Sequence, residues 1–213
     1  MIFQNRREAG RELAKKLDDY ADQDDVIVLG LARGGLPVAD EVAKALDAPL
    51  DVFLVQKLGM PGREELAMGA IASGGVRVLN QDVIARANIG DEKVEQVAQQ
   101  EKEELERREQ AYRGDRERLD LENKIVILVD DGLATGASMR AAVEAVKTVQ
   151  PKKVVVAVPT ASAEACGDLE GRVDDAVCAQ TPSPFFGVGA WYEEFSQVND
   201  QQVRQILEDS RQS

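Results

Sequence analysis

Two adjacent carboxylates, Asp130 and Asp131, are followed at once by small and hydroxylated residues from Gly132 to Ser138. Neighbouring acids in a turn can accept hydrogen bonds from the two hydroxyls of a sugar diol, or they can help to hold Mg²⁺ through water. The hydroxyls of Thr135 and Ser138, with the amides of a helix N-terminus, suit a phosphate group. The alternative is an ordinary polar strand end with a helix cap, but the loop that follows favours a site for a sugar phosphate.

The loop after the acids offers backbone or side-chain donors at Gly132, Leu133, Ala134, Thr135, Gly136, Ala137 and Ser138. Gly136 and Ala137 are small enough for backbone N–H groups to approach a phosphate closely. Neither of two common nucleotide-binding strings, G-x-x-x-x-G-K-[ST] and G-x-G-x-x-G, occurs in the chain. The apolar run with its acids is therefore not the second motif of a nucleoside triphosphatase, and we expect the phosphate to hang from a pentose.

A second group of residues, Arg33-Gly34-Gly35 together with Lys57, lies at the ends of two other predicted strands. A cation beside two glycines, with a further cation on the neighbouring strand, can surround a pyrophosphate. An Arg-Gly-Gly turn alone is weak evidence. Beside the acids and the loop, on the same edge of the same sheet, it predicts a second anion site.

Short apolar runs alternate with amphipathic helical segments, and this order predicts how the two groups are positioned. The expected strands are 26–31, 50–55, 125–129, 153–158 (ended by Pro159) and 173–178, and the expected helices are 5–22, 37–46, 138–149, 162–169 and 200–207. Such alternation predicts an α/β fold, a three-layer sandwich with a central, mainly parallel sheet. Ligands of such sheets bind beyond the carboxyl ends of the strands, where both groups fall.

The other segments are expected to form an insertion and a small hood on a single domain of residues 1–213. The insertion, about 59–120, begins with a Gly- and Pro-containing stretch, 59–75, which we interpret as a mobile loop leading into a β-ribbon. Residues 76–79 complete the ribbon, and helices follow at 81–87 and 91–112, the second with a solvated charged face. The hood comprises about 181–199 together with the C-terminal helix.

Composition restricts the partners and the chemistry. The chain has 26 Lys and Arg against 39 Asp and Glu, a net charge of -13, which argues against a nucleic-acid partner and also fits a salt-rich cytoplasm. The absence of histidine removes mechanisms that need an imidazole base. Without a signal peptide or an apolar run of bilayer length, we expect a cytoplasmic protein with no membrane partner. Cys166 and Cys178 are expected to be free, buried, small apolar residues.

The motif that contains the two acids resembles the binding motif for 5-phosphoribosyl 1-diphosphate (PRPP) in type I phosphoribosyltransferases; it reads VILVDDGLATGAS at 126–138. Three further segments are similar to a little-characterised bacterial and archaeal branch of that family: RGGLPVADEVA at 33–43, QKLGMPGREELAMGAIASGG at 56–75 and VGAWYEEFSQV at 188–198. Together they cover nearly the whole chain. The resemblance implies an enzyme of nucleotide metabolism that transfers the 5-phosphoribosyl group of Mg-PRPP and releases pyrophosphate. The acceptor would be a nitrogenous base or an amine that the resemblance does not identify.

The resemblance also implies roles for individual residues. Asp130 and Asp131 match the acids that hold the ribose hydroxyls, and 133–138 matches the 5′-phosphate loop. The pyrophosphate loop corresponds to Ala32 through Gly35, with a cis peptide bond between Ala32 and Arg33. Arg33 and Lys57 would stabilise the leaving group, and Arg63, on a flexible catalytic loop at 59–68, would close over it.

One position departs from the family pattern. Ala134 stands where purine-salvage members carry an acid that serves the purine ring as a base, which argues against purine salvage. A built-in base would then be a carboxylate such as Glu64 or Glu65. The alternative function is a non-catalytic regulatory protein that binds PRPP or a nucleotide.

Two aromatic residues in the expected hood, Trp191 and Tyr192, have two interpretations. They can bind the acceptor by stacking on a base. Alternatively, they pack in the core or across the interface of a homodimer, where aromatic residues are enriched.

Overall fold

The computed structural model describes residues 1–114 and 116–211, and for residues 63–65 it describes the backbone only. Within these residues, five parallel strands form the central sheet in the order β2-β1-β6-β7-β8. Their bounds are Val26–Leu31 (β1), Leu50–Phe53 (β2), Ile125–Val129 (β6), Lys153–Thr160 (β7) and Asp175–Gln180 (β8). In the pairing of β1 with β6, Gly30 lies opposite Val129, so the loops that follow both strands leave the sheet at the same edge.

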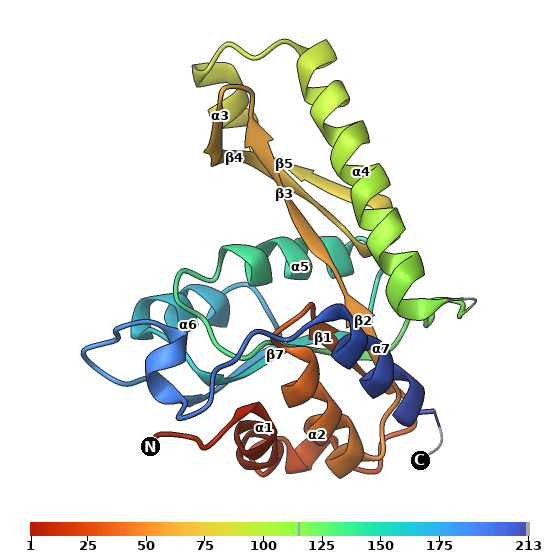
Figure 1. Cartoon of the computed structure of the whole chain (residues 1–213), viewed down its shortest axis with the longest axis vertical. Coiled ribbons are helices and arrows are strands. Elements are labelled where there is room, and N and C mark those ends of the chain that lie inside the picture. Colours follow the sequence, from red (N-terminus) through yellow and green to blue (C-terminus); the bar gives the residue numbers. More distant parts are fainter. Residues whose placement is uncertain (115, 212–213) are drawn as a thin grey trace.

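Helices cover both faces of this sheet and make it the middle of three layers (Figure 1). One face packs against α1 (Arg6–Ala14), α2 (Leu36–Leu46) and α7 (Asp200–Asp209), and the other against α5 (Ala137–Lys147) and α6 (Ala163–Glu170). Alternate residues of β6 belong to the two cores, Ile127 to the first and Leu128 to the second, as the two-residue period of a strand requires. The α/β three-layer prediction is confirmed.

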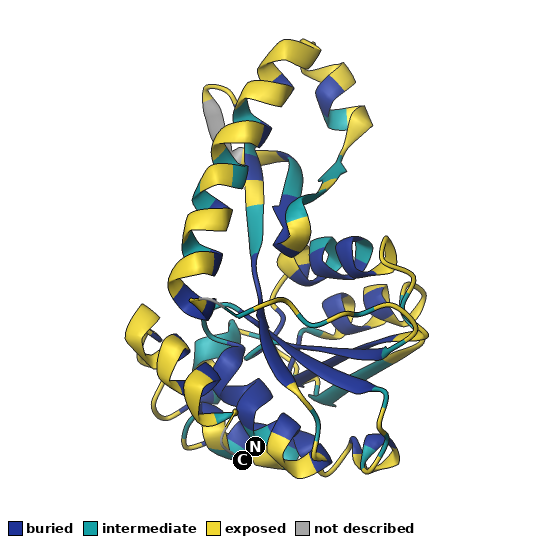
Figure 2. Cartoon of the chain, turned by 90° about the vertical axis from the view of Figure 1, so that its right-hand side faces the viewer, coloured by how far each residue is buried: buried dark blue, intermediate teal, exposed yellow. Residues whose placement is uncertain are grey.

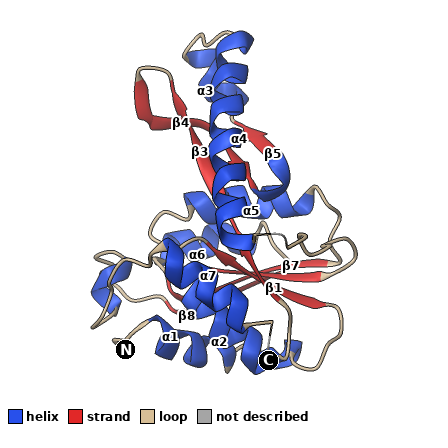
Figure 3. Ribbon diagram, turned by 45° about the vertical axis from the view of Figure 1, so that its right-hand side comes forward, coloured by secondary structure: helices blue, strands red, loops and turns tan. Residues whose placement is uncertain are grey.

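A second, antiparallel sheet rises beside α5 and has the strand order β3-β4-β5. It consists of β3 (Val55–Met60), β4 (Arg63–Ala72) and β5 (Val76–Leu79), and it is followed by α3 (Gln81–Arg86) and the long α4 (Asp91–Arg113). We call residues 55–113 the arm. Figure 3 shows α4 running along the strands of the arm down to the central sheet, and in Figure 2 its outward side is exposed.

The β-ribbon expected within 59–75 and completed by 76–79 is confirmed, because β4 pairs with β5, but the loop expected before it is wrong in extent, since β4 already begins at Arg63. Leu58, Met68 and Ile71 of the two strands are buried in a core that also contains Val94 and Leu105 of α4. Irregular pairing beside Gly59 breaks the alternation of polar and apolar residues, which hides the strand pattern in the sequence.

The base of α4 is fixed to the central sheet by a buried charged cluster. The guanidinium of Arg113 donates from Nε to Asp51 Oδ1 (3.0 Å), and it also donates to Glu109 Oε1 (3.1 Å) and to the carbonyl oxygen of Val52 (2.6 Å). All three charged side chains are at most 6% exposed. The arm is therefore anchored at β2, where the chain enters it.

Smaller differences from prediction occur at element ends. The first helix ends at Ala14 and is followed by the 3-10 helix η1 (Asp18–Tyr20), and the strand expected at 50–55 divides between β2 and β3. Pro159 lies inside β7 instead of ending it. Pairing with β6 stops at Ala157. Proline has no backbone N–H, and at Pro159 no hydrogen bond to β6 is required.

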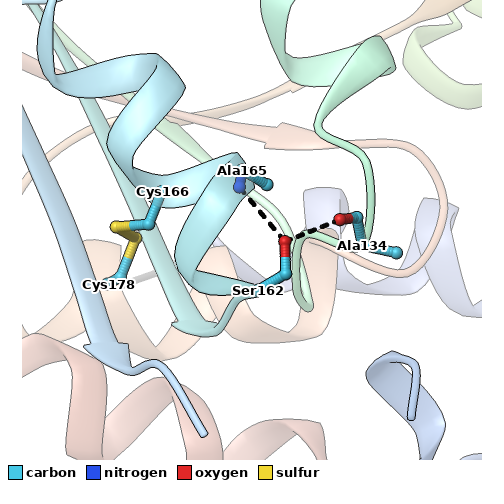
Figure 4. Close-up of a disulfide and its surroundings, with 5 residues drawn as sticks. All are labelled: Ala134, Ser162, Ala165, Cys166 and Cys178. Carbon is cyan, nitrogen blue, oxygen red and sulfur yellow. Dashed lines mark hydrogen bonds between the residues drawn. A yellow bond between two sulfur atoms is a disulfide. The ribbon is translucent and has the colours of Figure 1, made fainter. Parts of the chain in front are cut away.

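The prediction of two free cysteines is also wrong. Cys166 of α6 and Cys178 of β8 form a disulfide, with Cα atoms 6.5 Å apart (Figure 4). The bond ties a surface helix to the edge strand of the central sheet.

In the described part of the chain, no helix combines the length and the apolar character needed to cross a membrane. The longest of the helices above, α4 with 23 residues, is rich in charged side chains.

Candidate functional site

The Arg33-Gly34-Gly35 turn packs directly on the two acids, which follow the adjacent strand. A Cβ atom on Gly34 would lie 2.2 Å from Asp131 Oδ2, and one on Gly35 would lie 2.6 Å from the carbonyl oxygen of Val129. Only glycine allows an approach this close. The peptide bond between Ala32 and Arg33 is cis, as expected. The sheet edge thus brings the two predicted anion-binding segments into contact.

The two acids are partly enclosed and interact with each other. Asp130 Oδ1 accepts a hydrogen bond from the N–H of Asp131 (2.8 Å), and Asp131 Oδ2 accepts one from Nε of Arg6 (2.8 Å). Burial raises the pKa of both carboxyls, and the neighbouring charge of Asp131 raises the pKa of Asp130 further. Arg6 opposes this rise at Asp131. Such a pair favours a ligand that supplies hydroxyl donors or a cation.

Sequence reasoning missed Arg6. Its side chain, from the first residue of α1, is only 10% exposed, although it lies on a short amphipathic helix where an arginine is normally solvated. The pattern of that helix gives no local signal for this contact, because Arg6 and Asp131 are 125 residues apart in the chain.

The phosphate loop ends at the N-terminus of α5. Gly136 has a left-handed backbone (φ 70°), and its carbonyl accepts the hydrogen bond from the N–H of Arg140 that begins the helix. The first amides of α5 therefore face the loop, as in helix N-terminal phosphate sites. Arg140, also missed by sequence reasoning, folds back and donates from Nη1 to the carbonyl oxygen of Thr135 (2.8 Å) and to Asp168 (3.1 Å).

The N-terminus of α6 supports the same loop (Figure 4). Ser162 donates from its hydroxyl to the carbonyl oxygen of Ala134 (2.8 Å) and from its N–H to that of Leu133 (2.9 Å). The Ser162 hydroxyl also accepts from the N–H of Ala165, so one residue caps α6 and holds the loop. Gly132 packs under Val188 of the hood.

A cleft of about 590 Å³ lies between the arm and α5. Lys57 of β3 lines it together with Ala137 and Ser138 of the phosphate loop, and with Arg140. Arg33 is directed elsewhere: its Nη1 lies 3.4 Å from Asp200 Oδ1 at the N-terminus of α7. The two predicted cations thus lie apart, Lys57 in the cleft and Arg33 beside α7, and Ala32 packs against the core beneath the turn.

The aromatic residues of the hood lie beside the acids. Tyr192 is 6% exposed and donates its hydroxyl to the carbonyl oxygen of Asp131 (2.6 Å), while its ring lies 5.0 Å from that of Phe195. Trp191 is half-buried and stacks on Phe185 at 6.5 Å. Its Nε1 is buried and has no hydrogen-bond partner among the described residues. Tyr192 therefore holds the backbone of Asp131 from the side of the hood.

Two further candidates cannot be placed, because the side chains of Arg63 and Glu65 lie outside the described residues, as does that of Glu64. Among the described residues, no three Asp, Glu or Cys side chains form a metal-binding group. Asp130 and Asp131 alone fit Mg²⁺ when substrate oxygens and water complete its coordination, because Mg²⁺ is commonly held by one or two carboxylates together with phosphates.

Comparison with known proteins identifies the class. Residues 1–190 match the family model for the phosphoribosyl transferase domain, and the chain belongs to that family. It is 44% identical over 207 residues to "Putative phosphoribosyl transferase Rv0571c" of Mycobacterium tuberculosis (strain ATCC 25618 / H37Rv). The alignment covers 97% of this chain but 46% of the relative, so the chain spans about half the length of that protein.

The structure is similar to the crystal structure of TT1426 from Thermus thermophilus, with a TM-score of 0.86 and 42% sequence identity. The match covers 98% of this chain and 99% of TT1426, so it includes the arm as well as the central sheet. The fold is that of the type I phosphoribosyltransferases.

Proposed function

We propose that the protein transfers the 5-phosphoribosyl group of Mg-PRPP to a nitrogenous base or amine and releases pyrophosphate. Family membership supports the choice of donor. The observation that carries the proposal is the packing of Gly34 against Asp131, because it joins a turn suited to pyrophosphate to acids suited to a ribose diol.

Each part of PRPP has a matching segment. Asp130 and Asp131 would accept hydrogen bonds from the ribose hydroxyls, and the loop 132–138 would hold the 5′-phosphate at the N-terminus of α5. The pyrophosphate would lie on the turn from Ala32 to Gly35. Mg²⁺ would be held by Asp130 and Asp131 with the substrate, and when bound it supplies positive charge beside the diphosphate.

In the transfer, the bond from ribose C1 to the pyrophosphate oxygen breaks, and its electron pair leaves with pyrophosphate. A lone pair of the acceptor nitrogen forms the new bond to C1, and the acceptor then loses a proton. Arg33, Lys57 and the amides of Gly34 and Gly35 would stabilise the charge that develops on the leaving group. Fixed positions for sugar, phosphate and pyrophosphate supply the rest of the rate enhancement.

The other roles concern the arm and the hood. Arg63, near the tip of the arm hairpin, would close over the pyrophosphate and exclude water, and Glu65 would accept the acceptor's proton. Trp191 is the better of the two hood aromatics for contact with the acceptor, because Tyr192 is nearly fully buried. Ala134 offers no carboxylate, which argues against a purine acceptor.

The test is incubation with Mg-PRPP and a panel of bases and amines, with pyrophosphate release as the measurement. We expect release that depends on one acceptor, and its loss in the double variant Asp130→Asn/Asp131→Asn. Binding of Mg-PRPP by calorimetry without acceptor-dependent release would instead support a regulatory binding protein. Unchanged PRPP affinity in the double variant would overturn the site.

A further inference from the structure

The guanidinium of Arg6 joins three segments that are far apart in the chain. It comes from α1, donates from Nε to Asp131 Oδ2 and donates from Nη1 to the carbonyl oxygen of Ser196, each at 2.8 Å. Its Cζ lies 4.0 Å from the centre of the Phe195 ring, within cation–π range. Two charge-assisted hydrogen bonds and a ring contact on a buried, planar group leave it one orientation.

The hood reaches Asp131 by a second route. Tyr192 donates its hydroxyl to the carbonyl oxygen of Asp131, and its ring stacks on Phe195, the ring that lies under Arg6. The hood therefore contacts the backbone of Asp131 directly and its carboxylate through Arg6.

The hood is in turn paired with the start of the chain. The N–H of Phe3 donates to the carbonyl oxygen of Trp191, and the N–H of Glu193 donates to that of Phe3. Phe3, 1% exposed, also packs on the ring of Tyr192. The hood thus packs with the first residues and α1 as one unit, and this unit contacts Asp131.

This packing affects how Asp131 can bind a sugar. Arg6 engages one carboxylate oxygen of Asp131, so the other oxygen is left to accept a hydrogen bond from a ribose hydroxyl. Arg6 also fixes the direction in which that second oxygen points. Gly34 borders the oxygen that Arg6 engages, Oδ2, and so further restricts the movement of this carboxylate.

We propose that Arg6 is a positioning residue that orients the Asp131 carboxylate for ribose binding and couples that orientation to the packing of the hood. The inference rests on the proposed function for the identity of the sugar ligand. It assigns no contact between Arg6 and the ligand itself.

The test compares Arg6→Gln and Arg6→Lys with Arg11→Gln, a control on the same helix whose arginine is 56% exposed. Calorimetry measures the affinity for Mg-PRPP and, separately, for metal-free pyrophosphate. We expect Arg6→Gln to weaken Mg-PRPP binding by about tenfold or more and to change the binding of metal-free pyrophosphate by less than about twofold, since without Mg²⁺ the diphosphate does not use Asp131. Arg6→Lys keeps the charge but loses the two-direction geometry, so its affinity should lie between those of Arg6→Gln and wild type.

Hydrogen exchange provides a readout that needs no ligand. The amides of Tyr192, Glu193 and Glu194 are hydrogen-bonded in the structure, and we expect them to exchange faster in Arg6→Gln than in Arg11→Gln. Equal loss of both affinities would indicate general destabilisation and overturn the inference, as would unchanged Mg-PRPP binding. Wild-type binding without pyrophosphate release would overturn the transfer reaction while leaving the role of Arg6 intact.

Discussion

The Cβ position of Gly34 lies 2.2 Å from Oδ2 of Asp131, while that of the next residue, Gly35, is confined by backbone oxygens of Val129 (2.6 Å) and Leu31 (2.8 Å). A methyl group at Gly34 would displace a side-chain carboxylate. The same methyl group at Gly35 would have to move two strand ends. Gly34 therefore borders a side chain of the candidate site, whereas Gly35 borders the backbone of two strand ends.

Replacement of these glycines should separate binding from stability. We expect Gly34→Ala to weaken Mg-PRPP binding by at least about tenfold, because it turns the Asp131 carboxylate away from Arg6, with little change in thermal stability. Gly35→Ala should instead lower the free energy of unfolding by about 1–3 kcal/mol. Gly167→Ala on α6, where a Cβ meets nothing within 4 Å, is the control. Calorimetry and thermal unfolding measure the two effects, and equal behaviour of the two variants would contradict the assignment.

Lys57 and Ser138 face one cleft from opposite walls, and their replacement should affect different halves of the substrate. Lys57→Met should weaken binding of Mg-pyrophosphate by about 10- to 100-fold and leave ribose 5-phosphate binding unchanged, because a charged hydrogen bond contributes about 1.5–3 kcal/mol. Ser138→Ala should weaken ribose 5-phosphate binding only. Lys93→Met, on the exposed side of α4, controls for the loss of charge. If both ligands weaken together in either variant, the division of the site is wrong.

The buried cluster at the base of α4 predicts a large stability effect. Arg113→Met leaves Asp51 buried without its cation and leaves Glu109 with Arg118 alone, so the free energy of unfolding should fall by about 3–5 kcal/mol. Arg107→Met, which removes an exposed partner of Glu104 on the same helix, should change it by less than about 0.5 kcal/mol. Denaturant unfolding of both variants gives the comparison, and similar losses would argue against the cluster.

The Cys166–Cys178 disulfide should stabilise the fold. It closes a loop with a sequence separation of 12, for which the chain-entropy account gives about 2–3 kcal/mol. Reduction of the wild type should lower the free energy of unfolding by that amount and have no effect on the double variant Cys166→Ala/Cys178→Ala. A thiol titration in unfolding buffer confirms the oxidised state, and an unchanged melting temperature after full reduction would contradict the prediction.

The hydroxyl of Tyr20 in η1 donates to Asp175 Oδ2 at the start of β8 (2.8 Å). Burial, and then this hydrogen bond, raise the pKa of the phenol above its ordinary value. Folding therefore favours the protonated phenol, and this contribution is complete below pH about 10 and is lost as the pH rises further. Above pH about 10, wild-type stability should fall up to about 1.4 kcal/mol per pH unit more steeply than that of Tyr20→Phe. Parallel pH profiles would show that Tyr20 contributes nothing.

The strands that carry the site could be predicted from the sequence to the residue. β1 and β6 are short, unbroken apolar runs that are buried on both faces, so their length and their ends can be read from the sequence. The parallel topology then places Gly34 and Asp130 at one edge. The arm was harder to predict for two reasons. Irregular pairing beside Gly59 interrupts the alternation of polar and apolar residues along the strand, and short glycine-containing segments resemble a loop.

Contacts between distant residues could not be predicted in this way. An arginine such as Arg6 or Arg113 has the same local pattern on an amphipathic helix whether it is solvated or buried in an ion pair. The pairing of Cys166 with Cys178 depends on the register of α6 over β8, which spacing alone does not specify. These contacts determine which of the predicted site residues are held in place and from which side.

The anchoring of α4 has a mechanical consequence. A helix of 23 residues is about 34 Å long, so it acts as a lever whose pivot is Arg113 and whose far end carries the tip of the arm. A tilt of about 5° at the pivot displaces that end by about 3 Å. We therefore expect a small change at the buried ion pair of Arg113 with Asp51 to be magnified at the tip of the arm.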